Sequence, residues 1–195
     1  MCDITLIALD GFGQREGHRR GTYWDLPRMS HLRSAAYKRG LDIVFPEMGI
    51  NWTDHKAKRL ADNVLEGGIP NPVFMGFSDG GKAAIAAAHR AHAPFVAYAI
   101  AAVRRVPRDP LPGLFVVNDR DKLTHDTTAE TYARFYGDWG AWVDFREVKD
   151  RRPSVKRRLH RHYWLPSANP YILEWAARAA AAWYGFQDKL NKMKE

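Results

Sequence analysis

The sequence is poor in cysteine, and this excludes two classes of site. Cys2 is the only cysteine among 195 residues. A disulfide framework and a cysteine-based zinc site each need more than one cysteine, so both are excluded. A chain without disulfides is typical of a reducing compartment, and we therefore expect a cytoplasmic location.

Long apolar runs and targeting signals are also lacking. No apolar run is long enough to span a membrane. The first residues, "MCDITLIALDG", have no basic region and only a short apolar one, so they do not resemble a signal peptide. We therefore expect no membrane association.

The motifs that bind common cofactors are missing as well. The segment "GFGQRE" (11–16) lacks the third glycine of a dinucleotide-binding fingerprint, and no Walker A motif occurs. His89 and His92 are three residues apart in a helical pattern, but no carboxylate or third ligand is spaced with them. We therefore expect neither a metal nor an organic cofactor.

Charge is the one compositional feature out of the ordinary. The formal net charge is +8 and the isoelectric point is near 9.7. Such a balance fits a nucleic-acid partner, an acidic substrate, an anionic surface or simply a well-solvated exterior. A basic run, "KDRRPSVKRRLHRH" (149–162), either attracts anions or forms a solvated loop. We favour the solvated loop and expect no nucleic-acid partner, although the charge permits one.

Apolar segments alternate with helical patterns along the whole chain. Near-continuous apolar runs indicate strands that are buried on both faces, as in a parallel sheet. The strands are expected at 3–11, 41–49, 72–78, 94–103, 111–119 and 142–148, the last being more polar and therefore an edge strand. The helices are expected at 25–39, 54–66, 82–92, 126–137 and 169–184, with Asn169 as N-cap and Pro170 as first helical residue. This order predicts a three-layer α/β/α sandwich around a mostly parallel sheet of about six strands.

The most informative motif lies between the third expected strand and the helix after it. The residues Gly76-Phe77-Ser78-Asp79-Gly80 fit the pattern G-x-S-x-G. In this pattern a sharp, strained turn exposes the serine, so the flanking positions must be small. The following helix points its N-terminus at the site, where developing negative charge is favoured. The alternative is a glycine-rich turn that only packs closely or binds a phosphate.

A nucleophilic serine needs a base and a residue that orients the base. With this motif the chain order is serine, acid, histidine. The end of the fifth strand, "LFVVNDRD", supplies Asp119 and Asp121, and the segment before the last helix supplies His160 and His162. The carboxyl ends of parallel strands are where open α/β sheets place their sites.

These segments together resemble the α/β-hydrolase superfamily over nearly the whole chain. "GFSDGG" resembles its nucleophile elbow, "PGLFVVNDRDKLT" its acid-bearing strand end, and "HYW" with "NPYILEWAARA" its histidine loop and closing helix. The resemblance implies a minimal α/β-hydrolase fold with Ser78 as nucleophile, Asp121 as acid and His162 as base. Asp119 is the alternative acid, and His160 is the alternative base.

The resemblance extends to the oxyanion loop. "ALDGFGQ" (8–14) is similar to the loop after an early strand in that superfamily, with aspartate at position 10 where many members have histidine. It implies that the backbone N–H groups of Phe12 and Asp79 hold the oxyanion. Trp164 is expected as an apolar substrate contact beside the triad.

The resemblance also carries an expectation about what covers the site. Only "RRVPRDP" separates Val103 from Leu111, where members often insert a lid. We therefore expect one lidless domain over residues 1–195, similar to small carboxylesterases and cutinases, which takes a small-molecule or polymeric ester with a short acyl chain. The alternatives are a thioesterase, amidase or peptidase, and a non-catalytic protein of this fold that binds a polyanion through its basic loop.

Overall fold

A computed structural model gives the structure of the chain at residues 3–9, 27–46, 52–100, 103, 105–151 and 164–194. For residues 27–30 it gives the backbone only. The predictions made for Phe12, His160 and His162 lie outside these described residues.

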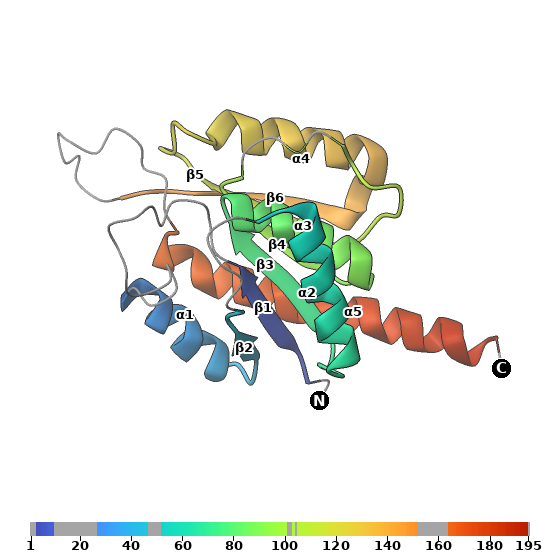
Figure 1. Ribbon diagram of the computed structural model, residues 1–195. Coiled ribbons are helices and arrows are strands. Elements are labelled where there is room, and N and C mark those ends of the chain that lie inside the picture. The colour runs from blue at the N-terminus through green and yellow to red at the C-terminus, as the bar shows by residue number, and fades with distance from the viewer. Residues whose placement is uncertain are drawn as a thin grey trace.

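The centre of the fold is a parallel sheet of six strands in the order β2-β1-β3-β4-β5-β6. Figure 1 shows the strands running side by side through the middle of the molecule. The strands are β1 (Thr5–Leu9), β2 (Asp42–Val44), β3 (Pro72–Phe77), β4 (Phe95–Tyr98), β5 (Gly113–Asn118) and β6 (Val143–Val148). All six expected strands are present, and β6 is an edge strand as its polar sequence predicts.

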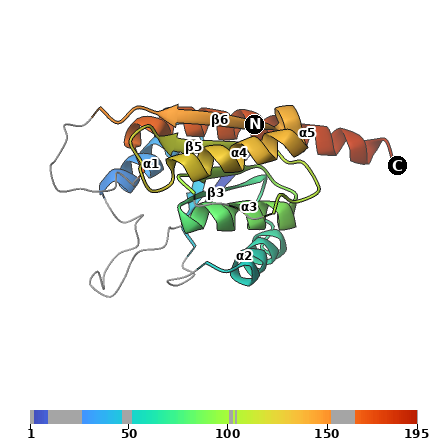
Figure 2. The same ribbon diagram turned by 90° about the horizontal axis from the view of Figure 1, so that it is seen from above.

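Helices cover both faces of the sheet, which makes three layers (Figures 1 and 2). The helices are α1 (Pro27–Tyr37), α2 (Asp54–Glu66), α3 (Asp79–Ala91), α4 (His125–Trp139) and α5 (Asn169–Lys192). On one face, Leu32 of α1 and Ile172 of α5 share a buried cluster with Leu6, Val73 and Leu114. On the other face, side chains of α2, α3 and α4 pack against alternate strand residues, among them Ile7, Phe74 and Phe95. The predicted three-layer α/β/α sandwich is confirmed.

The start of α3 and the end of α5 differ most from the predicted helix boundaries. Helix α3 begins at Asp79 rather than at 82, because Gly80 and Gly81 form the first helical turn instead of a loop. Helix α5 continues to Lys192, well beyond the predicted end at 184. Phe186 and Leu190 lie on this extension, and Lys192 pairs with Asp188 at 2.8 Å, one turn earlier.

Asn169 is not the N-cap of α5, contrary to the prediction. Ala168 occupies the cap position after a short 3₁₀ turn, η3 (Pro166–Ala168), and Asn169 already has helical dihedral angles. The Asn169 side chain accepts a hydrogen bond of 2.6 Å from the Trp164 indole N–H instead. The side chain of Asn169 thus binds a buried indole five residues earlier in the chain instead of capping the helix.

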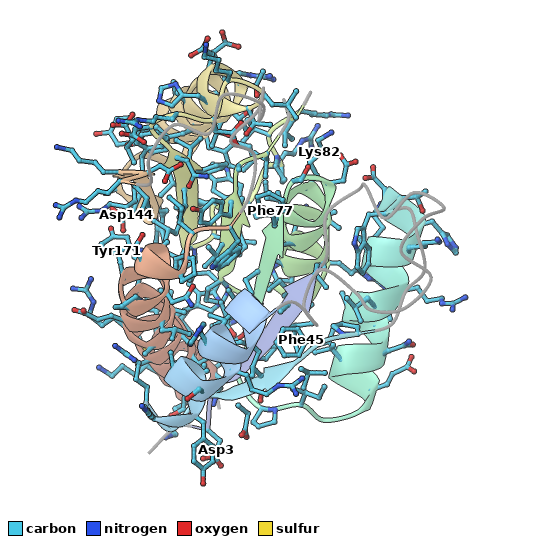
Figure 3. All side chains as sticks on the ribbon, turned by 90° about the vertical axis from the view of Figure 1, so that its left-hand side faces the viewer. Asp3, Phe45, Phe77, Lys82, Asp144 and Tyr171 are labelled. Carbon is cyan, nitrogen blue, oxygen red and sulfur yellow. The ribbon has the colours of Figure 1, made fainter. Side chains whose placement is uncertain are left out.

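The parallel arrangement brings the carboxyl ends of all strands to one edge of the sheet. Figure 3 looks toward this edge, with Phe77 at the end of β3 and Lys82 on α3 just beyond it. Among the described residues, none of the helices combines the length and the apolar character that crossing a membrane requires.

Candidate active site

Ser78 has an unusual backbone conformation at the junction of β3 and α3. Its dihedral angles are φ 57° and ψ −122°. A positive φ is costly for a residue with a side chain and persists only where the surroundings impose it. Ser78 is half-buried, whereas all of β3 before it is buried. The chain thus turns sharply at the serine and leaves it partly open at the edge of the sheet.

Two glycines make this turn sterically feasible. A Cβ atom on Gly76 would lie 2.0 Å from the backbone oxygen of Gly80. A Cβ atom on Gly81 would lie 2.3 Å from the Cγ2 atom of Ile100. Both distances are far below van der Waals contact, so the first turn of α3 can approach β3 and β4 only because these positions carry no side chain.

Hydrogen bonds hold the turn on both sides. The Ser78 N–H donates to the Tyr98 carbonyl oxygen at 2.9 Å, and the Gly81 N–H donates to the Ser78 carbonyl oxygen at 3.0 Å. The Asp79 N–H belongs to the first turn of α3, where amide donors have no carbonyl partner within the helix. The Asp79 carboxylate turns to Lys82, 3.1 Å away. The start of α3 therefore supplies an amide donor and a favourable dipole beside the serine.

Asp121 is fully buried just beyond the end of β5. Its Oδ1 atom accepts hydrogen bonds from the backbone N–H groups of Leu123 at 3.0 Å and Thr124 at 3.2 Å. Its Oδ2 atom accepts one from the Thr124 hydroxyl at 2.9 Å. Hydrogen bonds of this kind favour the charged form of a carboxylate and fix its orientation.

Asp119, the alternative acid, lies two residues earlier and joins two strand ends. Its Oδ1 atom accepts a 2.8 Å hydrogen bond from the Asp150 N–H, and its own N–H donates to the Val148 carbonyl oxygen at 3.0 Å. The carboxylate thus ties the residues that follow β6 to the end of β5. This role matches the capping function that a polar residue often has at such a position.

The ends of β3 and β5 are separated by β4 alone. Strands two apart in a sheet lie roughly 10 Å from each other. An imidazole that hydrogen-bonds through both nitrogens can bridge a serine and a carboxylate across such a gap. The structure therefore places Ser78 and Asp121 at the same edge of the sheet, while His162 and Phe12 lie outside the described residues.

His125 contacts two carboxylates near the site, and the sequence analysis did not identify it. Its Nε2 atom lies 2.8 Å from Glu147 of β6, and its Nδ1 atom lies 3.1 Å from Asp126. The hydrogen bond to Glu147, followed by that to Asp126, raises the pKa of His125 above its usual value. The backbone N–H of His125 donates to the Asp121 carbonyl oxygen at 3.0 Å. The side-chain contact with Glu147 therefore joins α4 to β6 next to the buried acid. Nothing local in the sequence indicates this pair, because 22 residues separate its members.

Trp164, which we expected as an apolar substrate contact beside the triad, is fully buried. Its indole stacks on the Tyr98 ring, with centroids 4.6 Å apart and an angle of 25° between the planes. Its N–H donates to Asn169. A buried ring has no surface to offer a substrate, so the structure gives Trp164 a packing role instead.

Tyr98 connects the strand ends that surround the site. Its hydroxyl hydrogen-bonds with Asn118 Oδ1 at the end of β5 and accepts a 3.2 Å hydrogen bond from the Leu165 N–H.

In the part of the chain that the structure describes, no group of three or more His, Cys, Asp or Glu side chains could hold a metal ion. The described chemistry is therefore that of a serine, amide donors and buried carboxylates.

Comparisons with solved structures identify the fold of the chain. A variant of SOBER1 from Arabidopsis thaliana matches with a TM-score of 0.61 and 13% identity, covering 90% of this chain and 99% of that chain. TT1662 from Thermus thermophilus matches with a TM-score of 0.64 and 13% identity, covering 92% and 90%. XC6422 from Xanthomonas campestris, described as an α/β serine hydrolase without lid, matches with a TM-score of 0.53 and 14% identity, covering 76% and 72%.

The chain has the α/β-hydrolase fold. Sequence comparison adds nothing to this result, since no protein-family model and no curated protein matches the sequence. TM-scores of 0.53–0.64 establish a shared fold, whereas identities of 13–14% do not establish a shared activity. The strained serine of this α/β-hydrolase fold lies where β3 ends, at the carboxyl edge of the sheet.

Proposed function

We propose that the protein is a serine hydrolase that cleaves carboxylic esters through an acyl-enzyme. The observation that carries this proposal is the conformation of Ser78, at φ 57° and ψ −122° between β3 and α3. Glycine adopts a positive φ at the least cost, so a tight turn alone does not require a serine at this position. A serine at this position is strained, and such strain is typical of a nucleophile that must project from its turn.

In the proposed reaction, the Ser78 hydroxyl oxygen attacks the ester carbonyl carbon while His162 accepts the hydroxyl proton. The oxyanion that forms accepts hydrogen bonds from the backbone N–H groups of Asp79 and Phe12. When the tetrahedral intermediate collapses, the carbon–oxygen bond to the alcohol breaks, and His162 gives its proton to the leaving alcohol.

Deacylation repeats these steps with water. His162 takes a proton from a water molecule, the resulting hydroxide attacks the acyl carbon, and the acid leaves as the Ser78 hydroxyl is restored. Asp121 orients the imidazole and stabilises its charged form. The three hydrogen bonds from Leu123 and Thr124 support this role, because they fix the orientation of the carboxylate.

The substrate class that we propose is an ester with a short acyl chain, of about two to four carbons. Residues 103 and 105–111, where members of the fold often insert a lid, contain no helix or strand. An open site gives apolar contact to only the first few methylenes of an acyl chain, each worth roughly 0.8 kcal/mol when buried. The proposed triad would equally serve a thioester or an amide.

The proposal is tested with a fluorophosphonate probe and a series of p-nitrophenyl esters. The wild-type protein should be labelled, and the variant Ser78→Ala should lose both labelling and turnover while keeping its unfolding transition. Hydrolysis should be fastest for acetate to butyrate esters. A wild-type protein that is neither labelled nor active, yet binds a polyanion such as heparin, would instead be a non-catalytic member of the fold.

A further inference from the structure

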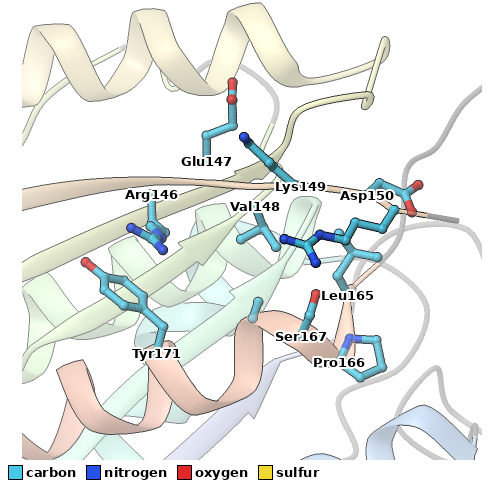
Figure 4. Close-up of a pocket in the computed structure, with 11 residues that line it drawn as sticks. Arg146, Glu147, Val148, Lys149, Asp150, Leu165, Pro166, Ser167 and Tyr171 are labelled. Atoms are coloured by element: carbon cyan, nitrogen blue, oxygen red, sulfur yellow. The ribbon is translucent and has the colours of Figure 1, made fainter.

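A cavity of about 850 Å³ lies between the end of β6 and the start of α5 (Figure 4). Its lining includes three basic side chains, Arg146, Lys149 and Arg151, together with Ser167 and Tyr171. A volume of this size is typical of sites for small organic molecules. None of these residues has a part in the proposed hydrolysis.

The three basic side chains have no carboxylate partner among the described residues, and each is exposed. The Arg146 guanidinium instead lies over the Tyr171 ring, 4.8 Å from its centroid. This contact holds the guanidinium in place through the ring face and leaves its N–H groups available. An arginine held in this way is prepared to donate two parallel hydrogen bonds to an oxyanion.

The acidic residues near these basic side chains do not form ion pairs with them, because they contact other residues or are buried. Asp144 accepts a 2.7 Å hydrogen bond from the Trp175 indole N–H, and Glu147 contacts His125 at 2.8 Å. In Figure 4 the Glu147 carboxylate and the Lys149 ammonium group both point to the opposite side of β6 from Tyr171 and Ser167. Asp150 also lines the cavity, but it is buried at 2% exposure. Arg146 and Arg151 therefore make no carboxylate contact among the described residues, although Glu147 and Asp150 also line the cavity.

The remaining lining suits an anion with an organic body. Ser167 lies in η3 directly before α5, and its exposed hydroxyl can donate to an oxyanion. Val148, Leu165 and Pro166 add apolar surface around it. Two guanidinium groups, a hydroxyl and apolar walls are the composition of a site that fixes the charged group of a ligand and covers its uncharged part.

We propose that this cavity binds a small organic anion whose phosphate or carboxylate group is held by Arg146 and Arg151. This inference goes beyond the proposed ester hydrolysis and does not depend on it. The shared chemistry of the ligand is an oxyanion attached to an organic body of about mononucleotide size.

The experiment is isothermal titration calorimetry at low salt with four probes. These are adenosine 5′-monophosphate, citrate, inorganic phosphate and neutral adenosine. Saturable one-site binding is expected for adenosine 5′-monophosphate or for citrate, and the better of the two tells whether phosphate or carboxylate is preferred. Adenosine should not bind, because it lacks the group that the cations recognise.

Variants show whether the binding takes place in the cavity. Arg146→Gln and Arg151→Gln should each weaken the binding about tenfold or more, because hydrogen bonds between charged groups contribute on that scale. Arg33→Gln is the matched control, since Arg33 is exposed on α1 and lies 4.8 Å from the Phe45 ring centroid. It removes the same charge and the same kind of contact outside the cavity and should leave the affinity unchanged.

Three results would overturn the proposal: no saturable binding of either anion, equal binding of adenosine, or an equal loss of affinity in Arg33→Gln. The use of two variants guards against one that fails to fold. Binding that persists in Ser78→Ala would separate this site from the hydrolase site, so either proposal can fail without the other.

Discussion

The Ser78 N–H donates a hydrogen bond of 2.9 Å to the carbonyl oxygen of Tyr98. This single bond joins the strained serine to the last residue of β4. The Tyr98 side chain continues the connection, through its hydroxyl to Asn118 and Leu165 and through its ring to Trp164. One buried tyrosine thus links the serine turn, the end of the acid-bearing strand and the segment before α5.

The Tyr98 hydroxyl is therefore expected to stabilise the fold. Tyr98→Phe keeps the ring stacked on Trp164 but removes the hydroxyl that Asn118 and Leu165 both contact. The free energy of unfolding should fall by about 1–3 kcal/mol, the usual cost when a buried polar group loses a partner. Urea denaturation of this variant and of Tyr37→Phe provides the test. Tyr37 is 83% exposed, so its variant should match the wild type.

Gly76 should tolerate no side chain. Gly76→Ala places a Cβ atom 2.0 Å from the Gly80 carbonyl oxygen, a backbone atom that cannot rotate away. Overpacking of this kind typically costs about 1–3 kcal/mol, and α3 would also shift relative to Ser78. We expect a lower midpoint of thermal unfolding and the loss of fluorophosphonate labelling.

Gly137 on α4 is the matched control for this substitution. A Cβ atom there meets nothing within 4 Å. Gly137→Ala should leave labelling unchanged and raise the stability by up to about 1 kcal/mol, because alanine favours the helix. Full labelling of a folded Gly76→Ala variant would mean that the close approach of α3 is not needed for reactivity.

The two candidate acids and the two candidate bases can be separated by kinetics. Asp121→Ala and His162→Ala should each lower kcat by several orders of magnitude, as substitutions of triad members do. Asp119→Ala and His160→Ala should change kcat less than about tenfold, because residues outside the triad only adjust its geometry. The reverse ranking in either pair would move that assignment by two residues.

The contact between His125 and Glu147 should make stability depend on pH. The pKa of His125 is raised in the folded state, so the contact contributes fully below about pH 6.5, the ordinary histidine value. Its contribution is lost as the pH rises through the raised pKa. From pH 6 to pH 9, the wild type should therefore lose more of its free energy of unfolding than His125→Ala does.

The measurement is a series of denaturant titrations across that pH range. His55→Ala serves as the control, because His55 is exposed on α2. This control variant should retain the pH dependence of the wild type. Identical slopes for the wild type and His125→Ala would show that the contact does not contribute to stability.

The sequence by itself determined the six strands, their parallel class and the candidate nucleophile. Apolar runs such as Pro72–Phe77 are buried on both faces of the sheet, and that burial is visible in the run itself. The motif around Ser78 could be found for a similar reason. Its steric requirement concerns residues only a few positions apart, so the small residues it needs stand close together in the chain.

Only the tertiary structure decided the partners of individual side chains. Trp164 was expected beside a substrate but stacks on Tyr98, and Asn169 was expected as a cap but accepts from Trp164. The pairing of His125 with Glu147 and the meeting of Arg146 with Tyr171 have the same origin. The contacts of Trp164 with Tyr98, of His125 with Glu147 and of Arg146 with Tyr171 depend on which parts of the fold lie side by side. That arrangement is set by the burial of whole faces rather than by any local pattern.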